Sequence, residues 1–259
     1  MSNNHAFHRA KWESEIARLM SKIFITGSTD GLGQMAAREL IDRGHEVYLH
    51  ARNDDRAADA RKALPGAAGV LVADLDDLDA VRDLAAAANE AGPFATVIHN
   101  AAVYRSDGPT IARVNVLAPY LLTCLMDRPE QLIYLSSNDH SWGNFREDQL
   151  DKDDPQMTYA DSKVMIAALA LIVAREWPQV RSNAIDPGWV PTKMGGKGAP
   201  DDLDEGYATQ VWLADKTPDV SGKYLYHKRE GDLKSIVRDE QKQAALLEAC
   251  ERATGVAFP

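Results

Sequence analysis

Cysteine is scarce in this chain of 259 residues, which contains only Cys124 and Cys250. The two stand in no metal-binding or redox spacing, and a small disulfide-held secreted domain needs more of them. The pair is typical of a protein that folds in a reducing compartment. We therefore expect a cytoplasmic protein, and the sequence predicts no metal site.

Long apolar runs and net positive charge are also missing. The longest apolar run, from Val164 to Ala174, is too short to cross a bilayer, and the first residues contain no apolar signal-peptide core. Asp and Glu (39) outnumber Lys and Arg (29), which gives a net charge of −10. Because nucleic acids and anionic membranes bind basic surfaces, we expect neither as a partner.

Apolar strand-like runs alternate with helical patterns from Lys22 to the C-terminus. The expected strands are 22–26, 47–50, 69–73, 95–99, 131–135, 180–185 and 223–227. The expected helices are 32–43, 54–64, 76–91, one within 110–126, 159–177 and 240–252. This alternation favours one α/β domain, residues 22–259, with a doubly wound Rossmann-type parallel sheet of about seven strands and helices on both faces. Residues 1–21 form an N-terminal extension with a helical pattern.

A glycine-rich segment, TGSTDGLG, stands between the first expected strand and the first expected helix. It comprises Thr26, Gly27, Ser28, Thr29, Asp30, Gly31, Leu32 and Gly33. The glycines allow a tight turn, close approach to a pyrophosphate, and close packing of helix on strand. Since free N–H groups at a helix start bind phosphate, the segment predicts a dinucleotide site, with an ordinary strand-to-helix turn as the alternative.

The end of the second expected strand indicates which dinucleotide binds. A fold that prefers NAD places an acid here for the ribose 2′-hydroxyl, whereas this chain has Ala51 and then Arg52. A guanidinium can pair with a 2′-phosphate, so Arg52 favours NADP(H) over NAD(H). A surface arginine close to Asp54 and Asp55 is the alternative interpretation.

The next two strand ends add binding candidates. Asp74, followed by Leu75, can contact an adenine ring or cap the next helix. Asn100 can brace adjacent strand ends, and the small Ala101 lets the chain pass beneath a cofactor.

Tyr159 and Lys163 stand four residues apart at a helix start, and Ser137 follows the fifth expected strand. Positions i and i+4 share a helix face, so both side chains can reach one cleft. A nearby ammonium lowers the pKa of a phenol from about 10, and a serine hydroxyl can donate to a substrate oxygen. The set suits hydride transfer to a carbonyl that takes its proton from Tyr159. For the pair alone, a packed tyrosine and a solvated lysine remain the alternative.

These motifs, in this order, resemble the short-chain dehydrogenase/reductase family. Thr26-Gly27-x-x-x-Gly31-x-Gly33 matches its coenzyme motif, Asp74 its adenine-pocket aspartate, and Asn115, Ser137, Tyr159 and Lys163 its catalytic tetrad. Asn100 and Ala101 match its Asn-Asn-Ala-Gly motif, from which His99 and Ala102 depart. The segment Pro187, Gly188, Trp189 and Val190 resembles its Pro-Gly motif, and Thr192 stands where the family contacts the carboxamide.

The resemblance implies a role for each member of the tetrad. Tyr159 would donate the proton, and Lys163 would bind the nicotinamide ribose and lower the tyrosine pKa. Ser137 would orient the carbonyl, and Asn115 would hold a water that links Lys163 to solvent. The long segment between Ser137 and Tyr159 resembles the retinol-dehydrogenase/carbonyl-reductase-like branch, whereas the stretch between Asn100 and Asn115 is shorter than usual.

We therefore expect an NADP(H)-dependent carbonyl reductase or alcohol dehydrogenase that acts on a small-molecule carbonyl or alcohol. A non-catalytic dinucleotide sensor or scaffold is one alternative, and a nucleotide-sugar epimerase or dehydratase is another. Trp142, Phe145 and Trp189 indicate apolar or aromatic substrate parts, unless they only pack. The helix from Tyr159 is apolar nearly all round, which, with the resemblance, implies a homodimer or homotetramer.

Overall fold

A sheet of eight strands runs through the computed structural model, which describes residues 20–259. The strands are β1 (Lys22–Ile25), β2 (Glu46–Ala51), β3 (Gly69–Val72), β4 (Thr96–His99), β5 (Gln131–Leu135), β6 (Arg181–Asp186), β7 (Lys223–Tyr226) and β8 (Arg229–Glu230). They lie in the order β3-β2-β1-β4-β5-β6-β7-β8, and every pair is parallel except β7 with β8. The predicted doubly wound sheet is confirmed, and β8 adds an antiparallel edge. The helix expected within residues 1–19 lies outside the described residues.

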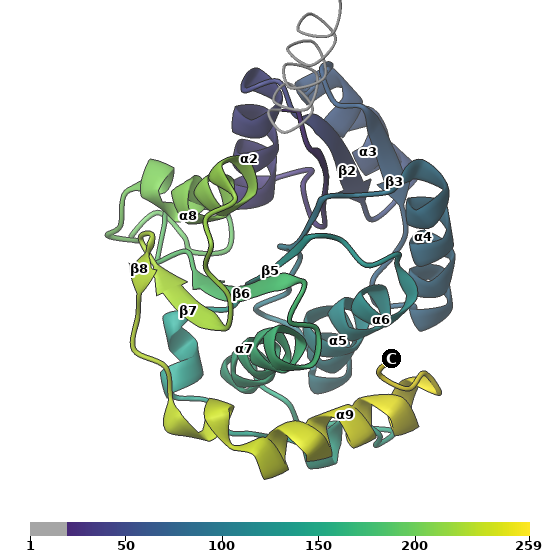
Figure 1. Ribbon diagram of the computed structural model, residues 1–259, viewed down its shortest axis with the longest axis vertical. Helices are drawn as coiled ribbons and strands as arrows, with labels where there is room; N and C mark the ends of the chain where they lie inside the picture. The colour runs from purple at the N-terminus through teal and green to yellow at the C-terminus, as the bar shows by residue number, and fades with distance from the viewer. Residues whose placement is uncertain (1–19) are drawn as a thin grey trace, which may run out of the picture.

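Helices cover both faces of this sheet (Figure 1). One layer contains α2 (Gly31–Asp42), α3 (Asp54–Ala63) and α8 (Leu203–Lys216). The other contains α4 (Leu78–Ala91), α5 (Gly108–Ala112), α6 (Ala118–Leu125), α7 (Tyr159–Glu176) and α9 (Glu240–Thr254). A π-helical turn, η1 (Arg113–Leu117), joins α5 to α6, and the 3₁₀ turns are η2 (Asn138–Ser141), η3 (Glu147–Gln149) and η4 (Ser235–Arg238).

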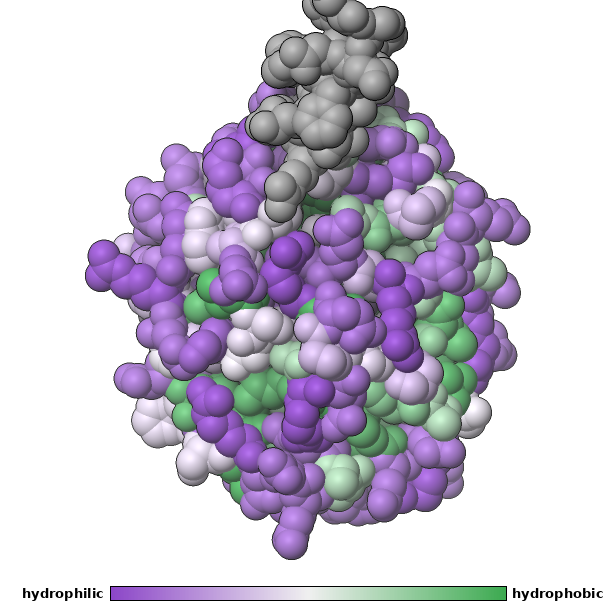
Figure 2. Space-filling view, in the orientation of Figure 1, coloured by the Kyte–Doolittle hydropathy of each residue, from purple (hydrophilic) through white to green (hydrophobic). Residues whose placement is uncertain are grey.

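The central strands are apolar and buried on both faces, as parallel strands between two helical layers must be. The side chains of Ile23, Phe24, Ile25 and Ile133 have no exposed surface. The outer surface is different: Figure 2 shows a mainly hydrophilic face on which apolar residues form separate patches. The carboxyl ends of β1 to β7 meet along one edge, so the loops that follow them can share a single site.

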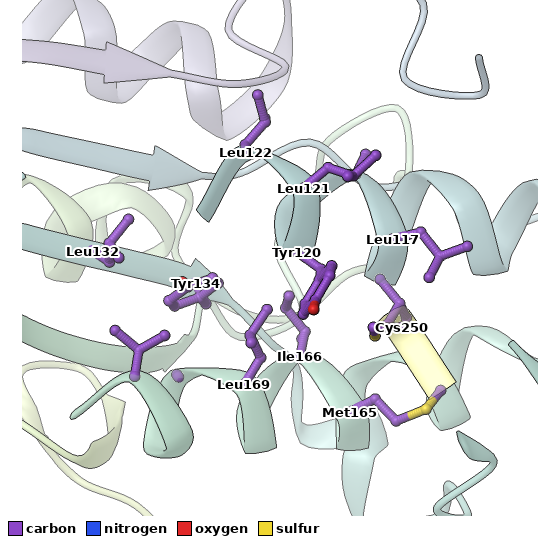
Figure 3. Close-up of a cluster of buried hydrophobic side chains, with 14 of the residues drawn as sticks. Leu117, Tyr120, Leu121, Leu122, Leu132, Tyr134, Met165, Ile166, Leu169 and Cys250 are labelled. Carbon is purple, nitrogen blue, oxygen red and sulfur yellow. The ribbon is translucent and has the colours of Figure 1, made fainter. Parts of the chain in front are cut away.

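The C-terminal helix α9 covers the apolar helix α7, which is buried from Asp161 to Val173. Cys250 of α9 lies close to Tyr120 of α6 in the cluster that Figure 3 shows. The Tyr120 hydroxyl donates to the carbonyl of Val256 over 2.8 Å, which ties down the residues beyond α9. Assembly into a homo-oligomer stays a prediction, but an uncovered face of α7 no longer supports it.

Helix α8 was not predicted from the sequence. Its buried positions include Gly206, Thr209 and Gln210, which are small or polar, so its sequence lacks a clear apolar stripe. The helix begins where the Asp202 carboxylate accepts the backbone N–H groups of Asp204 and Glu205.

Candidate functional site

The glycine turn at residues 26–33 lies at the carboxyl end of β1 and opens α2. A Cβ at Gly27 would lie 2.8 Å from Cα of Ala101, and one at Gly33 would lie 2.6 Å from the carbonyl oxygen of Gly27. A Cβ at Gly31 would meet no protein atom within 4 Å, because this position faces open space. Packing therefore requires two of the glycines, and the third leaves the backbone open to an approaching group such as a dinucleotide pyrophosphate.

Asn100 braces this turn from the end of β4. Its Nδ2 donates to the carbonyl oxygens of Thr26 and Gly27, each over 3.0 Å. The Thr26 hydroxyl in turn accepts the backbone N–H groups of Asn100 and Ala101. The expected bracing role of Asn100 is confirmed, and Thr26 holds the same two strand ends together.

His50, at the end of β2, was missed as a site residue. Its Nδ1 accepts the backbone N–H of Gly27 over 3.0 Å, and its Nε2 lies 3.0 Å from the carbonyl of Ala73. These two contacts fix the neutral tautomer with the proton on Nε2. Burial lowers the pKa of His50 to about 4, which keeps the ring uncharged. The available signal was a histidine at the end of the apolar run VYLH.

A cleft of about 460 Å³ runs from the glycine turn to Tyr159. Most predicted cofactor residues line it: Gly27, Thr29, Asp30, Gly31, Leu32, Arg52, Asp74, Leu75, Asn100, Ala101, Tyr159, Lys163, Pro187 and Thr192. Five predicted residues do not: Thr26, Ser28, Gly33, Gly188 and Val190. Thr26, Ser28 and Val190 are buried, Gly33 packs against Asn100, and Gly188 supplies a positive φ of 78° beside Trp189. These five shape the cleft wall from behind.

The sequence leaves two roles open for Asp74 after β3, contact with an adenine ring or capping of the next helix. Asp77 caps α4 by accepting the N–H groups of Asp79 and Ala80, so Asp74 is not the cap. Asp74 instead accepts the N–H of Asp76 over 3.1 Å and lines the cleft. It is therefore free to contact a group bound there.

Two arginines lie where α3 begins. Arg52 is exposed, lines the cleft and follows β2 directly. Arg56, which sequence analysis missed, donates to the Thr29 hydroxyl over 3.1 Å and lies 3.5 Å from the Asp30 carboxylate. Asp54 and Asp55 occupy the first turn of α3, where acids stabilise a helix start.

Tyr159 and Lys163 lie together at the start of α7. The Lys163 Nζ stands 5.1 Å from the centre of the Tyr159 ring and donates to the carbonyl of Leu135 over 2.6 Å. The helix start is fixed by a capping box in which Thr158 and Asp161 exchange hydrogen bonds. Lys163 is buried, so the alternative of a solvated lysine is wrong.

The pKa values of this pair are set mainly by burial. Burial and the nearby Asp139 raise the pKa of Tyr159, and a hydrogen bond with the Ser137 hydroxyl offsets part of this rise. Burial lowers the pKa of Lys163 to about 7, although Asp139 and Asp186 oppose this. The tyrosine pKa therefore moves opposite to the expected direction, because removal from water disfavours the phenolate.

Asn115 lies in the π-helical turn η1, a distortion often found at functional sites. Its side-chain oxygen accepts the N–H of Val103 over 2.8 Å, and its Nδ2 donates to the Val103 carbonyl and to the Ser162 hydroxyl. Asn115 thus fixes the loop after β4 against α7, next to Lys163. Of the predicted tetrad, Tyr159 and Lys163 line this end of the cleft. Ser137 hydrogen-bonds to Tyr159, whereas Asn115 does not line the cleft and contacts α7 through Ser162.

A second histidine, His140, holds the backbone of Ser137, and the sequence analysis did not predict it as a site residue. Its Nδ1 donates to the Ser137 carbonyl over 2.8 Å, while its Nε2 accepts the N–H of Lys234 over 3.2 Å. Lys234 also donates through Nζ to the carbonyl of Gly143. The segment between β8 and η4 therefore holds the loop that carries Ser137.

Residues 20–259 contain no group of three or more His, Cys, Asp or Glu side chains that could hold a metal ion. Within the same residues, no helix combines the length and the apolar character that a membrane span requires.

Known proteins are similar to this chain in sequence and in fold. A family model described as short chain dehydrogenase matches residues 21–119. The short-chain dehydrogenase chyC of Penicillium rubens is 40% identical over 260 residues, which cover 93% of this chain and 100% of that protein. Retinol dehydrogenase 13 of Mus musculus is 27% identical over 91% of this chain and 84% of its own length. A crystal structure of a putative uncharacterized protein from Mycobacterium paratuberculosis superposes with a TM-score of 0.78 at 23% identity, covering 92% of this chain and 95% of that one.

The identity to chyC extends over nearly the whole of both proteins, and one cleft is lined both by the glycine turn and by Tyr159 and Lys163. Sequence, fold and site thus lead to one assignment: the chain belongs to the short-chain dehydrogenase/reductase family.

Proposed function

We propose that the chain is an NADP(H)-dependent oxidoreductase that transfers hydride between the nicotinamide and a carbonyl or secondary alcohol, with Tyr159 as proton donor and acceptor. The observation that best supports this proposal is that Tyr159 and Lys163 lie together at the far end of the cleft that begins at the glycine turn. A nicotinamide supplies the hydride when it is bound. The protein supplies the binding cleft, the proton and the orientation of the substrate oxygen.

The cofactor preference rests on the corner formed by Arg52, Arg56 and Thr29. A guanidinium binds a phosphate through charge-assisted hydrogen bonds, and the strand end offers no carboxylate for a free 2′-hydroxyl. NADP(H) therefore suits this corner better than NAD(H). Since cells keep NADP(H) largely reduced, we expect carbonyl reduction to be the working direction, and the two free cysteines are consistent with a cytoplasmic location.

The tyrosine would act as an acid whose proton is available throughout the neutral range. Burial keeps the Tyr159 hydroxyl protonated, and the Ser137 hydroxyl beside it can orient a carbonyl oxygen. His140 fixes the Ser137 backbone, and Asn115 fixes the opposite wall at Val103. These contacts favour a preorganised site for proton transfer over a sensor or scaffold, which needs no such arrangement.

The experiment is a panel of aldehydes, ketones and secondary alcohols given to the purified full chain with NADPH or NADH, followed by absorbance. We expect NADPH oxidation with some of the carbonyls and a lower KM for NADPH than for NADH. A chain that binds NADPH tightly and turns over no member of the panel would instead be a sensor. Oxidised cofactor retained through purification would favour the epimerase or dehydratase alternative.

A further inference from the structure

The exposed apolar side chains of this protein gather at the reacting end. Over residues 20–259, the large apolar side chains that remain exposed are Met20, Val72, Tyr104, Trp142, Trp189, Met194 and Tyr226. The last five lie at or after the carboxyl ends of β4, β5, β6 and β7, which are neighbours in the sheet. Scattered exposed apolar residues are ordinary, but a group on one edge marks a binding surface.

Tyr104 and Trp142 flank the proposed acid. The Tyr104 ring stands at 87° to the Tyr159 ring, with their centroids 4.9 Å apart. Trp142 precedes Gly143, which packs so tightly against the backbone of Ala160 that a Cβ there would overlap the Ala160 carbonyl. Trp142 is 82% exposed, and this packing holds the backbone beside it next to the start of α7.

Trp189 and Tyr226 lie at the next two strand ends, after β6 and at the end of β7. The Trp189 indole N–H donates to the Gly195 carbonyl over 2.8 Å, which fixes the ring while 59% of the residue stays exposed. The Tyr226 ring lies 3.5 Å from the position that a Cβ on Gly188 would occupy, directly before Trp189. Met194, on the same loop, lines the cleft together with Tyr159. The hydrogen bond of the Trp189 indole and the stacking of Tyr226 on His227, with ring centroids 3.8 Å apart, hold these two rings in place.

Charges at the reacting end disfavour an anionic substrate. Asp139 and Asp186 both lie close enough to Tyr159 to raise its pKa. Lys193 pairs with Asp30, and the Arg105 guanidinium lies 5.8 Å from the centre of the Tyr104 ring. The two carboxylates would repel a substrate carboxylate placed at the acid.

We infer that the site takes a neutral, planar aromatic carbonyl compound, with its ring system among Tyr104, Trp142 and Trp189 and its carbonyl oxygen at the Tyr159 hydroxyl. This inference rests on the proposed function and names the substrate class of that site. Planar rings gain from stacked and edge-to-face contacts that a flexible alkyl chain does not make. Each such contact is worth roughly a factor of two to ten in affinity.

The test uses neutral and charged probes of matched size. An acetylnaphthalene, the aliphatic ketone dodecanone with the same number of carbon atoms, and an acetylnaphthoate are compared by kcat/KM with NADPH. We expect the acetylnaphthalene to exceed dodecanone by about tenfold or more and the acetylnaphthoate to be the weaker aromatic substrate. Trp142→Ala and Trp189→Ala should each raise the KM for the acetylnaphthalene about five- to tenfold, and the phenylalanine variants should restore most of this loss.

Two controls separate this inference from the proposed function. Met20→Ala changes a residue that is as exposed as Trp189 (59%) but lies before β1, at the opposite edge of the sheet. This variant should leave every KM unchanged.

The second control is quenching of tryptophan fluorescence by the acetylnaphthalene, measured on Tyr159→Phe with NADP⁺ bound. It reports binding without turnover and should weaken when Trp142→Ala or Trp189→Ala is added. Equal kcat/KM for the acetylnaphthalene and dodecanone, or tryptophan variants with an unchanged KM, would overturn the aromatic assignment while carbonyl reduction stands. Failure of all carbonyls to oxidise NADPH would reject the proposed function, and absence of quenching would then reject the aromatic site as well.

Discussion

The backbone N–H of Gly27 donates to Nδ1 of His50 over 3.0 Å, and the opposite ring nitrogen of His50 lies 3.0 Å from the carbonyl of Ala73. One neutral imidazole therefore links the glycine turn after β1 to the ends of β2 and β3. The turn depends on this link because its own glycines have little intrinsic rigidity. His50 is thus a positioning residue for the cofactor end of the cleft.

We predict that His50→Ala weakens NADPH binding about tenfold, since an unpaired buried N–H costs on the order of 1–3 kcal/mol and the turn can relax. His45→Ala is the matched control: His45 is also buried and accepts the N–H of Ser21 through Nδ1 over 3.2 Å, but at the amino edge of the sheet. Both variants should unfold more easily. Titration of each with NADPH should show weaker binding for His50→Ala alone, and equal weakening would contradict the positioning role.

Arg52 and Arg56 should determine the cofactor preference. Arg52→Ala and Arg56→Ala should each raise the KM for NADPH by roughly ten- to a hundredfold, because hydrogen bonds to charged groups contribute about 1.5–3 kcal/mol. Their KM for NADH should change little, since NADH has no 2′-phosphate. Arg61→Ala, on the exposed last turn of α3, serves as the control. An equal effect on both cofactors would show that the two arginines do not contact a 2′-phosphate.

Carbonyl reduction should decline as the pH rises through about 7. Lys163 has a pKa lowered by burial to about 7, so its side chain is charged below this pH and neutral above it. Tyr159, whose pKa is raised, keeps its proton over the same range. The pH profile of kcat/KM reports the free enzyme, so it should show this single fall.

Lys163→Arg tests the origin of that fall. A guanidinium stays protonated, so the profile of this variant should lose the fall near neutral pH even if its rate is lower. A decline at the same pH in Lys163→Arg would assign the titration to another group.

The contact between α9 and the α6–α7 layer should contribute strongly to stability. Leu246 is 1% exposed, and its replacement by alanine should lower the free energy of unfolding by about 2–4 kcal/mol. Leu247 is half-buried on the same helix, and Leu247→Ala should cost clearly less. Urea unfolding of both variants measures the difference, and similar small losses would mean that α9 is only loosely attached.

The parts of the site that could be predicted from sequence are those with a local pattern. The glycine turn joins a strand to a helix within a few residues, and Tyr159 and Lys163 share one helical face, so spacing alone brings them together. The parallel, doubly wound sheet with helices on both faces followed from the alternation of strands and helices.

The parts that could not be predicted depend on contacts between distant segments. His50 and His140 read as ordinary strand-end and loop residues, because their partners Gly27 and Lys234 are far away in the chain. Arg56 reaches Thr29 only once α3 packs beside the glycine turn. The direction of the Tyr159 pKa shift was wrong because its dominant cause, burial, depends on the folded structure and cannot be read from the Tyr-Lys spacing.

If Tyr159 is the acid of a carbonyl reductase, its replacement by phenylalanine removes the proton that the substrate oxygen needs. The kcat of Tyr159→Phe with NADPH and a reducible ketone should therefore fall by about 10²–10⁴. NADPH binding should be nearly unchanged, and Tyr48→Phe, remote from the cleft on β2, should keep its activity. Near-normal turnover by Tyr159→Phe would contradict the account.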